Sequence, residues 1–387
     1  MTRRCGIWIV AVMGLVSLRV RGDVTRVPPD PGISAQAKAD LNMAPYSAEI
    51  AQKIGDEVNK LVQNPTDPGT VGMIRQWLIT EDPPTARPPY QTTYSEALNR
   101  TFMNVLSQGD PPVNAKINIG LVIKNLDAPK MNLAPTVEKL LADKCQAVVF
   151  VGEQAAWAIV QASIQNPNFT AATRDKLLAA IAGGVAANSD GPLAGFIADK
   201  AYCAINPKMW APPSMPSGDN LSALIDQNLN LLELRIKIYQ ATDVPAFPKG
   251  DTFPSYWLLS DNPIQGWSAM SNAQQIRTVQ DGLDLVSLMG QRAALAGQAS
   301  NPELVGALRE EGQWLSNMAQ VLGDGQLQTV CDQVVKLSPG MPGATIKAAC
   351  DAVYPQALLN QAFTNLRPQA LSISSGPTSA PTSEPSP

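Results

Sequence analysis

The chain has 387 residues, of which 45% are apolar and 16% are charged, and its formal net charge is −4. This length and apolar content suffice for one large helical array or for two domains. A nucleic-acid-binding surface needs a basic patch, so the mildly acidic balance and the lack of a long Lys/Arg block argue against such a protein.

The N-terminal 22 residues have the pattern of a signal peptide. Two arginines precede an apolar stretch over residues 5–18, which is short for a membrane span. Val20 and Gly22 are small enough for positions −3 and −1, so cleavage is expected after Gly22. We therefore expect an exported protein, periplasmic or extracellular, with no membrane span after cleavage. An uncleaved anchor is the alternative.

Residues 34–206 predict an array of helices separated by Pro, Gly and Asn. Residues 145–164 show the reasoning, because their centre Val-Val-Phe-Val also resembles a buried strand. Apolar residues recur there at helical spacing, at Val148, Val151, Ala155 and Ile159. The run contains no Pro or Asn that would end a strand within eight residues. A helix is therefore predicted.

The pattern breaks at residues 207–219, which are interpreted as a linker, and helical periodicity resumes over residues 220–366. Residues 221–241 contain LELRIKI, which alternates like a strand, but the length of the periodic run favours a helix. Ser300 and Glu303 predict a capping box at the start of a later helix. Residues 367–387 are rich in Ser, Thr and Pro, which predicts a disordered tail. With no hairpin or βαβ pattern, the fold class is all-α.

Four cysteines remain after removal of the signal peptide, and an even number in an oxidising compartment suggests two disulfides with three possible connectivities. We favour Cys331–Cys350, because the turn KLSPGMPGAT between them would fold two helices back on each other. Cys145–Cys203 then follows by elimination. Each bond would stabilise an unstrained fold by about 3–4 kcal/mol.

The segment DPPVNAKINIGLVIKNLDAPKMNLAPTVEKLLADKCQAVVFVGEQAAWAIVQASI, within residues 94–205, resembles degenerate HEAT-type repeats of exported bacterial proteins whose function is unassigned. The resemblance implies an α-α superhelix of HEAT-like helix pairs, followed here by a second helical domain. Asn114 and Gln146 stand where better-preserved repeats carry arginine or aspartate, so the number of repeats stays open. HEAT-like proteins bind other proteins, which implies an as yet unknown protein partner.

The chain contains no histidine, which excludes the usual Ser-His-Asp and Cys-His nucleophile systems and most zinc and copper sites. It also lacks the P-loop and GxGxxG patterns for nucleotides. We nominate no catalytic residue, metal or cofactor. The expected function is a non-catalytic binding or scaffold module of the cell envelope.

The alternative function is a carboxylate-dependent glycan-acting enzyme on an all-α toroid. Such an enzyme needs two carboxylates about 5–10 Å apart across a cleft. The acidic pairs Asp281/Asp284 and Glu310/Glu311 are instead interpreted as solvated helix faces.

The irregular segment before residue 270 concentrates aromatic side chains. Phe253, Tyr256, Trp257 and Trp267 are the candidate binding residues, because aromatic rings give a large contact area for little ordering entropy. The interpretation that we favour is that these rings plug the joint between the two helical halves.

Overall fold

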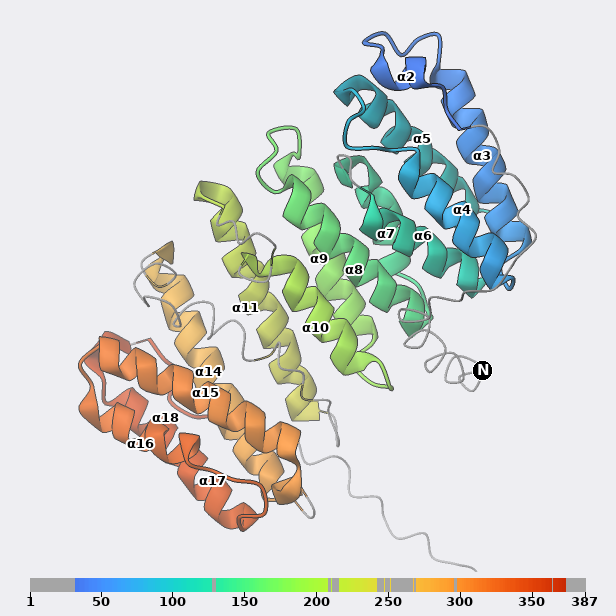
Figure 1. Cartoon of the computed structure of the whole chain (residues 1–387). Coiled ribbons are helices and arrows are strands. Elements are labelled where there is room, and N and C mark those ends of the chain that lie inside the picture. Colours follow the sequence, from blue (N-terminus) through green and yellow to red (C-terminus); the bar gives the residue numbers. More distant parts are fainter. Residues whose placement is uncertain are drawn as a thin grey trace, which may run out of the picture. The chain divides into compact units, whose positions relative to one another are not determined.

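The computed structural model describes residues 32–126, 130–207, 210, 216–241, 247, 251, 267, 269–295, 298–363 and 365–373. Every regular element in these ranges is a helix, so the predicted all-α class is confirmed (Figure 1). The predicted signal peptide, most of the predicted linker and residues 374–387 lie outside the described residues. The chain divides into two compact units, Met1–Gln227 and Asn228–Pro387.

Unit 1 contains nine complete α-helices among its described residues and the first part of a tenth. They are α2 (Ala35–Ala39), α3 (Ser47–Gln63), α4 (Pro68–Thr80), α5 (Pro88–Ser107), α6 (Val113–Asn125), α7 (Ala134–Leu141), α8 (Gln146–Ser163), α9 (Ala171–Ala187), α10 (Ala194–Ile205) and the start of α11 (Gly218–Ala241). A 3-10 turn, η3 (Lys130–Leu133), precedes α7.

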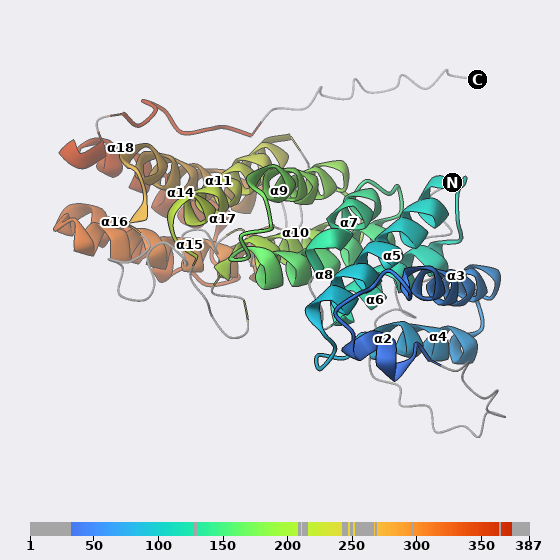
Figure 2. The same cartoon turned by 90° about the horizontal axis from the view of Figure 1, so that it is seen from above.

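The helices of unit 1 form two layers, which Figure 2 shows as two rows. In one layer α5 packs on α3 and α7, and α7 packs on α9. In the other layer α6 packs on α4 and α8, and α8 packs on α10. Consecutive helices therefore alternate between layers, and each of these helices meets the next but one along the chain.

Small residues let α8 lie close to both layers, and the helix predicted over residues 145–164 is confirmed. A Cβ atom at Gly120 of α6 would lie 2.6 Å from Cγ1 of Val151, and one at Gly152 would lie 3.2 Å from Cβ of Leu140. A Cβ atom at Gly120 would force Val151 to move, and one at Gly152 would press on Leu140, so glycine at these positions lets the helices lie close together.

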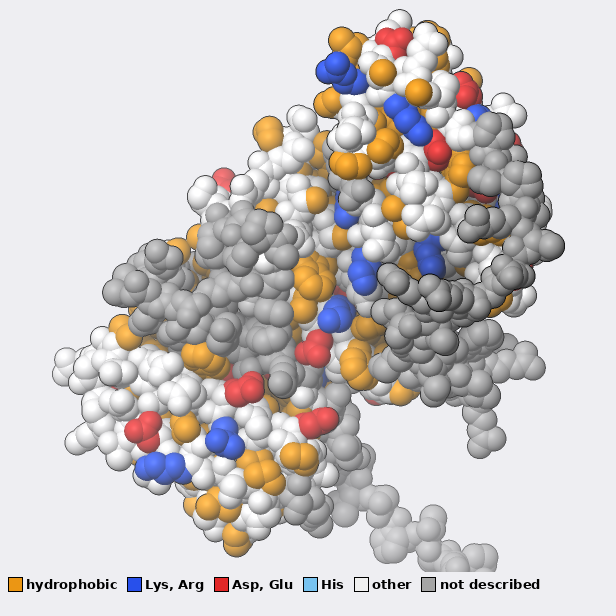
Figure 3. Space-filling view, viewed as in Figure 1, with side chains coloured by type: hydrophobic (Ala, Val, Ile, Leu, Met, Phe, Trp, Pro, Cys, Tyr) orange, Lys and Arg blue, Asp and Glu red, His pale blue; other side chains and the backbone are white. Residues whose placement is uncertain are grey.

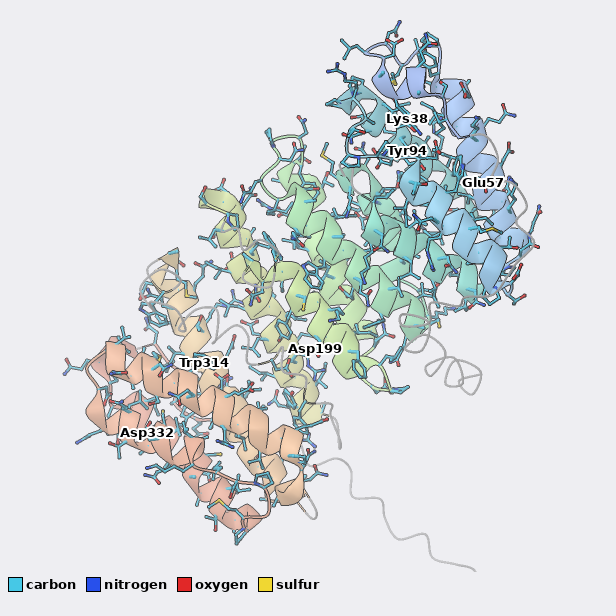
Figure 4. All side chains as sticks on the ribbon, in the orientation of Figure 1. Lys38, Glu57, Tyr94, Asp199, Trp314 and Asp332 are labelled. Carbon is cyan, nitrogen blue, oxygen red and sulfur yellow. The ribbon has the colours of Figure 1, made fainter. Side chains whose placement is uncertain are left out.

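Polar side chains tie the N-terminal helices of unit 1 together. Tyr94, labelled in Figure 4, is buried on α5 and donates a 2.7 Å hydrogen bond to the Leu78 carbonyl of α4. Tyr90, stacked on Tyr94 at 5.8 Å, donates to the carbonyl of Glu81. The Glu81 carboxylate in turn pairs with Lys38 of α2 at 2.8 Å. Buried hydroxyls are thus satisfied by the end of a neighbouring helix.

Unit 2 is built around α14. Its helices are the rest of α11, α14 (Asn272–Ala293), α15 (Pro302–Val321), α16 (Gly325–Val335), α17 (Gly343–Asp351) and α18 (Val353–Leu358), with 3-10 turns η6 (Gln298–Ser300) and η7 (Gln361–Phe363). α14 packs on α15, α17 and α18, and Arg277 of α14 pairs with Glu233 of α11 at 2.7 Å. The helix predicted over residues 221–241 is confirmed as part of α11.

Two further polar features order unit 2. Ser316 of α15 donates a 2.7 Å hydrogen bond to Asp332 of α16, which Figure 4 labels. The predicted capping box of Ser300 and Glu303 is wrong, because the N-cap of α15 is Asn301, whose Oδ1 accepts from the N–H groups of Glu303 and Leu304. An asparagine beside Pro302 caps the helix as well as serine does, and it shifts the start by one residue.

Candidate functional site

A groove of about 1020 Å³ crosses one edge of unit 1. It runs over three connections that each lead from one layer to the other, α5 to α6, α7 to α8 and α9 to α10. Its lining includes Asp110, Lys116, Asp143, Cys145, Gln146 and Gly191. The groove is the candidate site, because it is a large hollow formed by successive helix pairs.

Lys116 braces the first two connections. Its Nζ lies 2.7 Å from Oδ1 of Asp110 and 2.8 Å from Oδ2 of Asp143. Burial by itself would lower the pKa of Lys116, but the hydrogen bonds to both aspartates outweigh it and raise this pKa. The hydrogen bond from Lys116 likewise lowers the pKa of Asp110. Lys116 and Asp110 are therefore both charged at neutral pH.

Gln146 at the start of α8 braces the second and third connections. Its Oε1 accepts from the N–H of Leu193 at 3.1 Å, and its Nε2 donates to the carbonyl of Asp190. Gly191 has φ +90°, and a Cβ atom there would lie 2.9 Å from Nε2 of Gln146. Only glycine fits this conformation and this approach without strain. The groove floor is thus cross-linked by side chains.

Sequence patterns do not single out Lys116, Asp143 and Gln146 as a set. A signal for the groove is present, because an aspartate recurs in each of the three connections, at positions 110, 143 and 190. Spacing alone does not show that these connections share one edge, since that depends on which helices pack in the same layer.

The predicted Cys145–Cys203 disulfide is wrong, because the described cysteines form none. Gln146 holds the start of α8 against the start of α10, so the two helices begin at the same edge. Cys145 precedes α8, whereas Cys203 lies about ten residues into α10, roughly 15 Å further along its axis. A disulfide needs Cα atoms about 4–7 Å apart.

The predicted Cys331–Cys350 disulfide is wrong for a different reason. The two thiols are both buried but face different neighbours. Cys350 faces α14, since a Cβ atom at Gly290 would lie 2.9 Å from its Sγ. Burial, with nearby carboxylates including Glu311 of α15, raises the pKa of Cys331 to about 12. Burial also raises the pKa of Cys350 to about 12, so both are protonated thiols.

Of the aromatic candidates, Phe253, Tyr256 and Trp257 lie outside the described residues. Trp267 is half-buried just before α14, and its carbonyl accepts a 2.8 Å hydrogen bond from Nε2 of Gln275. Whether the four form a binding surface stays a prediction.

A carboxyl group is buried in α8 with no hydrogen-bond partner. Both side-chain oxygens of Glu153 lack a partner, and the residue is fully buried. Gly184 of α9 makes room for it, since a Cβ atom there would lie 2.8 Å from Oε1 of Glu153. Burial raises the pKa of Glu153 well above its usual range, so the native form is the neutral acid.

The interpretation of the unit 2 acidic pairs as solvated helix faces is wrong for three of the four residues. Asp281, Asp284 and Glu311 are 5%, 2% and 0% exposed, and only Glu310 lies on the surface. Burial raises the pKa of Asp281 and Asp284. Arg367 pairs with Asp284, and the two aspartates lie three residues apart on one helix, so they are not opposed across a cleft.

Charge does not mark a second site on the face that Figure 3 shows. On the face in Figure 3, basic and acidic side chains are scattered among apolar ones and do not form one large patch of a single sign. Within the described ranges, no three Cys, Asp or Glu side chains lie together as metal ligands would. No helix in those ranges combines the length and the apolar character needed to cross a membrane.

The chain matches no protein-family model, and neither a curated protein nor a solved structure is significantly similar to it.

Proposed function

We propose that unit 1 is a protein-binding module whose ligand is an extended segment of another protein, bound along the groove. The observation that carries this proposal is a groove of about 1020 Å³ that crosses three successive connections between helix pairs. A hollow of this kind accommodates a chain that runs from one helix pair to the next. Its floor is preorganised by Lys116 and Gln146, which reduces the entropy lost on binding.

We also propose that the two layers of unit 1 form a HEAT-like superhelix. The support is the alternation of consecutive helices between layers, with α6, α8 and α10 packed side by side. Each pair then buries an apolar face that it could not bury alone. Such an array works as a scaffold and needs no catalytic group.

Export to the periplasm or the extracellular space is a further part of this proposal. It rests on the N-terminal pattern alone, since the cysteines no longer support an oxidising compartment. N-terminal sequencing of the mature protein tests it. Asp23 as the first residue is expected, and an intact start at Met1 would contradict it.

The binding function is tested with a displayed library of linear peptides selected on the full chain. Affinities of the selected peptides are then measured for the chain and for Ala187→Trp. Ala187 is exposed at the end of α9 and lines the groove, so the indole would fill the space that the ligand occupies. We expect at least a tenfold loss of affinity.

Ala179→Trp is the matched control, because Ala179 is exposed on the same helix but does not line the groove. This variant should bind as the unchanged chain does. Equal affinities for both variants, or a library without binders, would contradict the proposal.

A further inference from the structure

The C-terminal end of the described chain is held against α14 as a peptide ligand would be. Residues 367–373 follow η7 without a helix of their own. Gln280 Oε1 accepts from the N–H of Arg367 at 2.7 Å, and Tyr354 donates to the Arg367 carbonyl at 2.9 Å. Side chains, not a neighbouring strand, therefore satisfy the backbone of this segment.

Gln291 pairs with the same segment twice. Its Nε2 donates to the carbonyl of Leu371 at 2.8 Å, and its Oε1 accepts from the N–H of Ile373 at 3.0 Å. One amide thus binds a C=O and an N–H two residues apart, as the edge of a sheet does when it receives an added strand. Binding of this kind depends on backbone groups and tolerates different side chains.

The ion pair of Arg367 with Asp284 lies between the contacts that Gln280 and Gln291 make with the segment. Gln280, Asp284 and Gln291 follow one another at i, i+4 and i+11, so they form one stripe along α14, called here the α14 strip. Arg367 pairs with Asp284, whose side chain is 3% exposed, whereas the side chain of Arg367 is 40% exposed. The N–H of Leu371 also binds Asp284. Asp284 is therefore a buried part of α14, whereas Arg367 lies at the surface.

The surroundings of Asp284 require a positive group at this position. Asp281 lies beside it with Oδ2 making no hydrogen bond, and Glu233 adds negative charge from α11. Arg277 is the other cation that acts on Asp281, and it is paired with Glu233. Without Arg367, the buried Asp284 would need a proton or another cation.

We propose that the α14 strip is a binding site for an extended, arginine-bearing segment of a partner protein, and that residues 367–373 occupy it as an exchangeable internal ligand. The segment is suited to exchange because Arg367, Pro368, Gln369 and Ser372 are exposed. It forms no helix or strand, and side-chain hydrogen bonds with one ion pair hold it, which is typical of the less stable parts of a fold. This site is independent of the unit 1 groove.

The test uses the full chain and a fluorescent peptide with the sequence LRPQALSI, residues 366–373. In the unchanged chain the tethered segment competes at an effective concentration on the order of millimolar, so the free peptide should bind weakly. Arg367→Ala weakens the internal ligand and leaves the α14 strip intact. Fluorescence anisotropy should show at least tenfold tighter peptide binding by this variant.

Three controls make the result specific. Adding Gln291→Leu to Arg367→Ala should abolish the gain, and a peptide with alanine in place of its arginine should bind at least tenfold more weakly. Arg309→Ala, an exposed arginine on α15, should behave as the unchanged chain does. Equal binding by Arg367→Ala and the unchanged chain would overturn the proposal.

Hydrogen exchange of the unchanged chain gives a second test that needs no variant. The N–H groups of Leu371 and Ile373 should exchange much faster than those in the centre of α14, and an excess of the peptide should speed them further. If these N–H groups exchange as slowly as those of α14 and the peptide has no effect, residues 367–373 are a permanent part of the fold. That result would overturn the proposal.

Discussion

Buried acidic side chains chosen from the two units show two opposite situations. In unit 1, Glu153 lies beside Gly184, and its carboxyl group has no hydrogen-bond partner. This group is a neutral acid in the folded protein. In unit 2, Asp251 and Asp284 each bind an arginine. A lone buried carboxyl makes a fold sensitive to pH, whereas a paired one makes it sensitive to loss of the partner. Each kind of sensitivity can be measured by itself.

The largest effect is expected for Arg235→Met in unit 2. Arg235 and Asp251 are both fully buried, and Nε of Arg235 lies 3.1 Å from Oδ1 of Asp251. Removing the cation leaves a buried carboxylate, which should lower the free energy of unfolding by about 3–5 kcal/mol. Denaturant titration at pH 7 measures this. Arg309→Met, at an exposed arginine, should change stability by less than about 1 kcal/mol.

In unit 1, Glu153→Gln should change the pH dependence of stability. The pKa of Glu153 is raised in the folded state, so between the unfolded value near 4.5 and the folded value the native protein holds one more proton than the unfolded chain. The contribution of Glu153 to the free energy of unfolding is complete below pH 4.5. Above that pH it falls by about 1.4 kcal/mol per pH unit, until the pKa of the folded state is reached. Glutamine removes this decline.

The measurement is denaturant unfolding at several pH values between 4 and 9. The difference between Glu153→Gln and the unchanged chain should grow with pH in favour of the variant. Glu96→Gln, at an exposed position of α5, serves as the control and should follow the unchanged chain. A constant difference between Glu153→Gln and the unchanged chain would show that Glu153 is ionised in the native protein.

A smaller effect is expected from Gly191→Ala at the unit 1 groove. The positive φ and the short approach to Gln146 make alanine strained there, at a cost of about 1–2 kcal/mol. Thermal unfolding measures the loss. Gly183→Ala, where a Cβ atom would meet nothing within 4 Å, should be neutral or stabilising. Equal effects would mean that the connection does not hold this conformation.

The smallest difference concerns helix caps in the two units. Ser271 caps α14 in a complete capping box with Gln274, whereas Thr170 caps α9 through one hydrogen bond. Ser271→Ala should therefore cost about 1 kcal/mol and Thr170→Ala about half as much. Denaturation midpoints compare them. If Thr170→Ala lost more stability than Ser271→Ala, the cap of α14 would be the weaker one, contrary to this prediction.

Periodicity predicted the class of the fold where the helical pattern was long. Residues 145–164 and 221–241 both contain short strand-like runs, yet helical spacing over the whole segment gave the correct element. The cap of α15 was missed by one residue, because Ser300 and Asn301 are both good caps and local sequence does not choose between them. The domain limits at residues 34, 206 and 220 stay predictions.

Contacts between distant residues could not be predicted in the same way. The two disulfide predictions were wrong because an even number of cysteines does not show on which face of its helix each cysteine lies. The buried acids were misjudged because a carboxyl group is normally solvated, and Arg367, which pairs with Asp284, lies 83 residues later in the chain. The candidate groove depends on helix layering, which no single segment encodes.

The common edge of α6, α8 and α10 has one more consequence. These three helices begin at the groove, and none has a side-chain cap hydrogen bond, while α5, α7 and α9 end there. Helix starts carry partial positive charge and helix ends partial negative charge. The partial charges of the helix termini along the two walls of the groove therefore have opposite signs. An extended chain points successive side chains to opposite sides, so a segment of alternating acidic and basic residues would present each kind of charge to the wall of opposite sign.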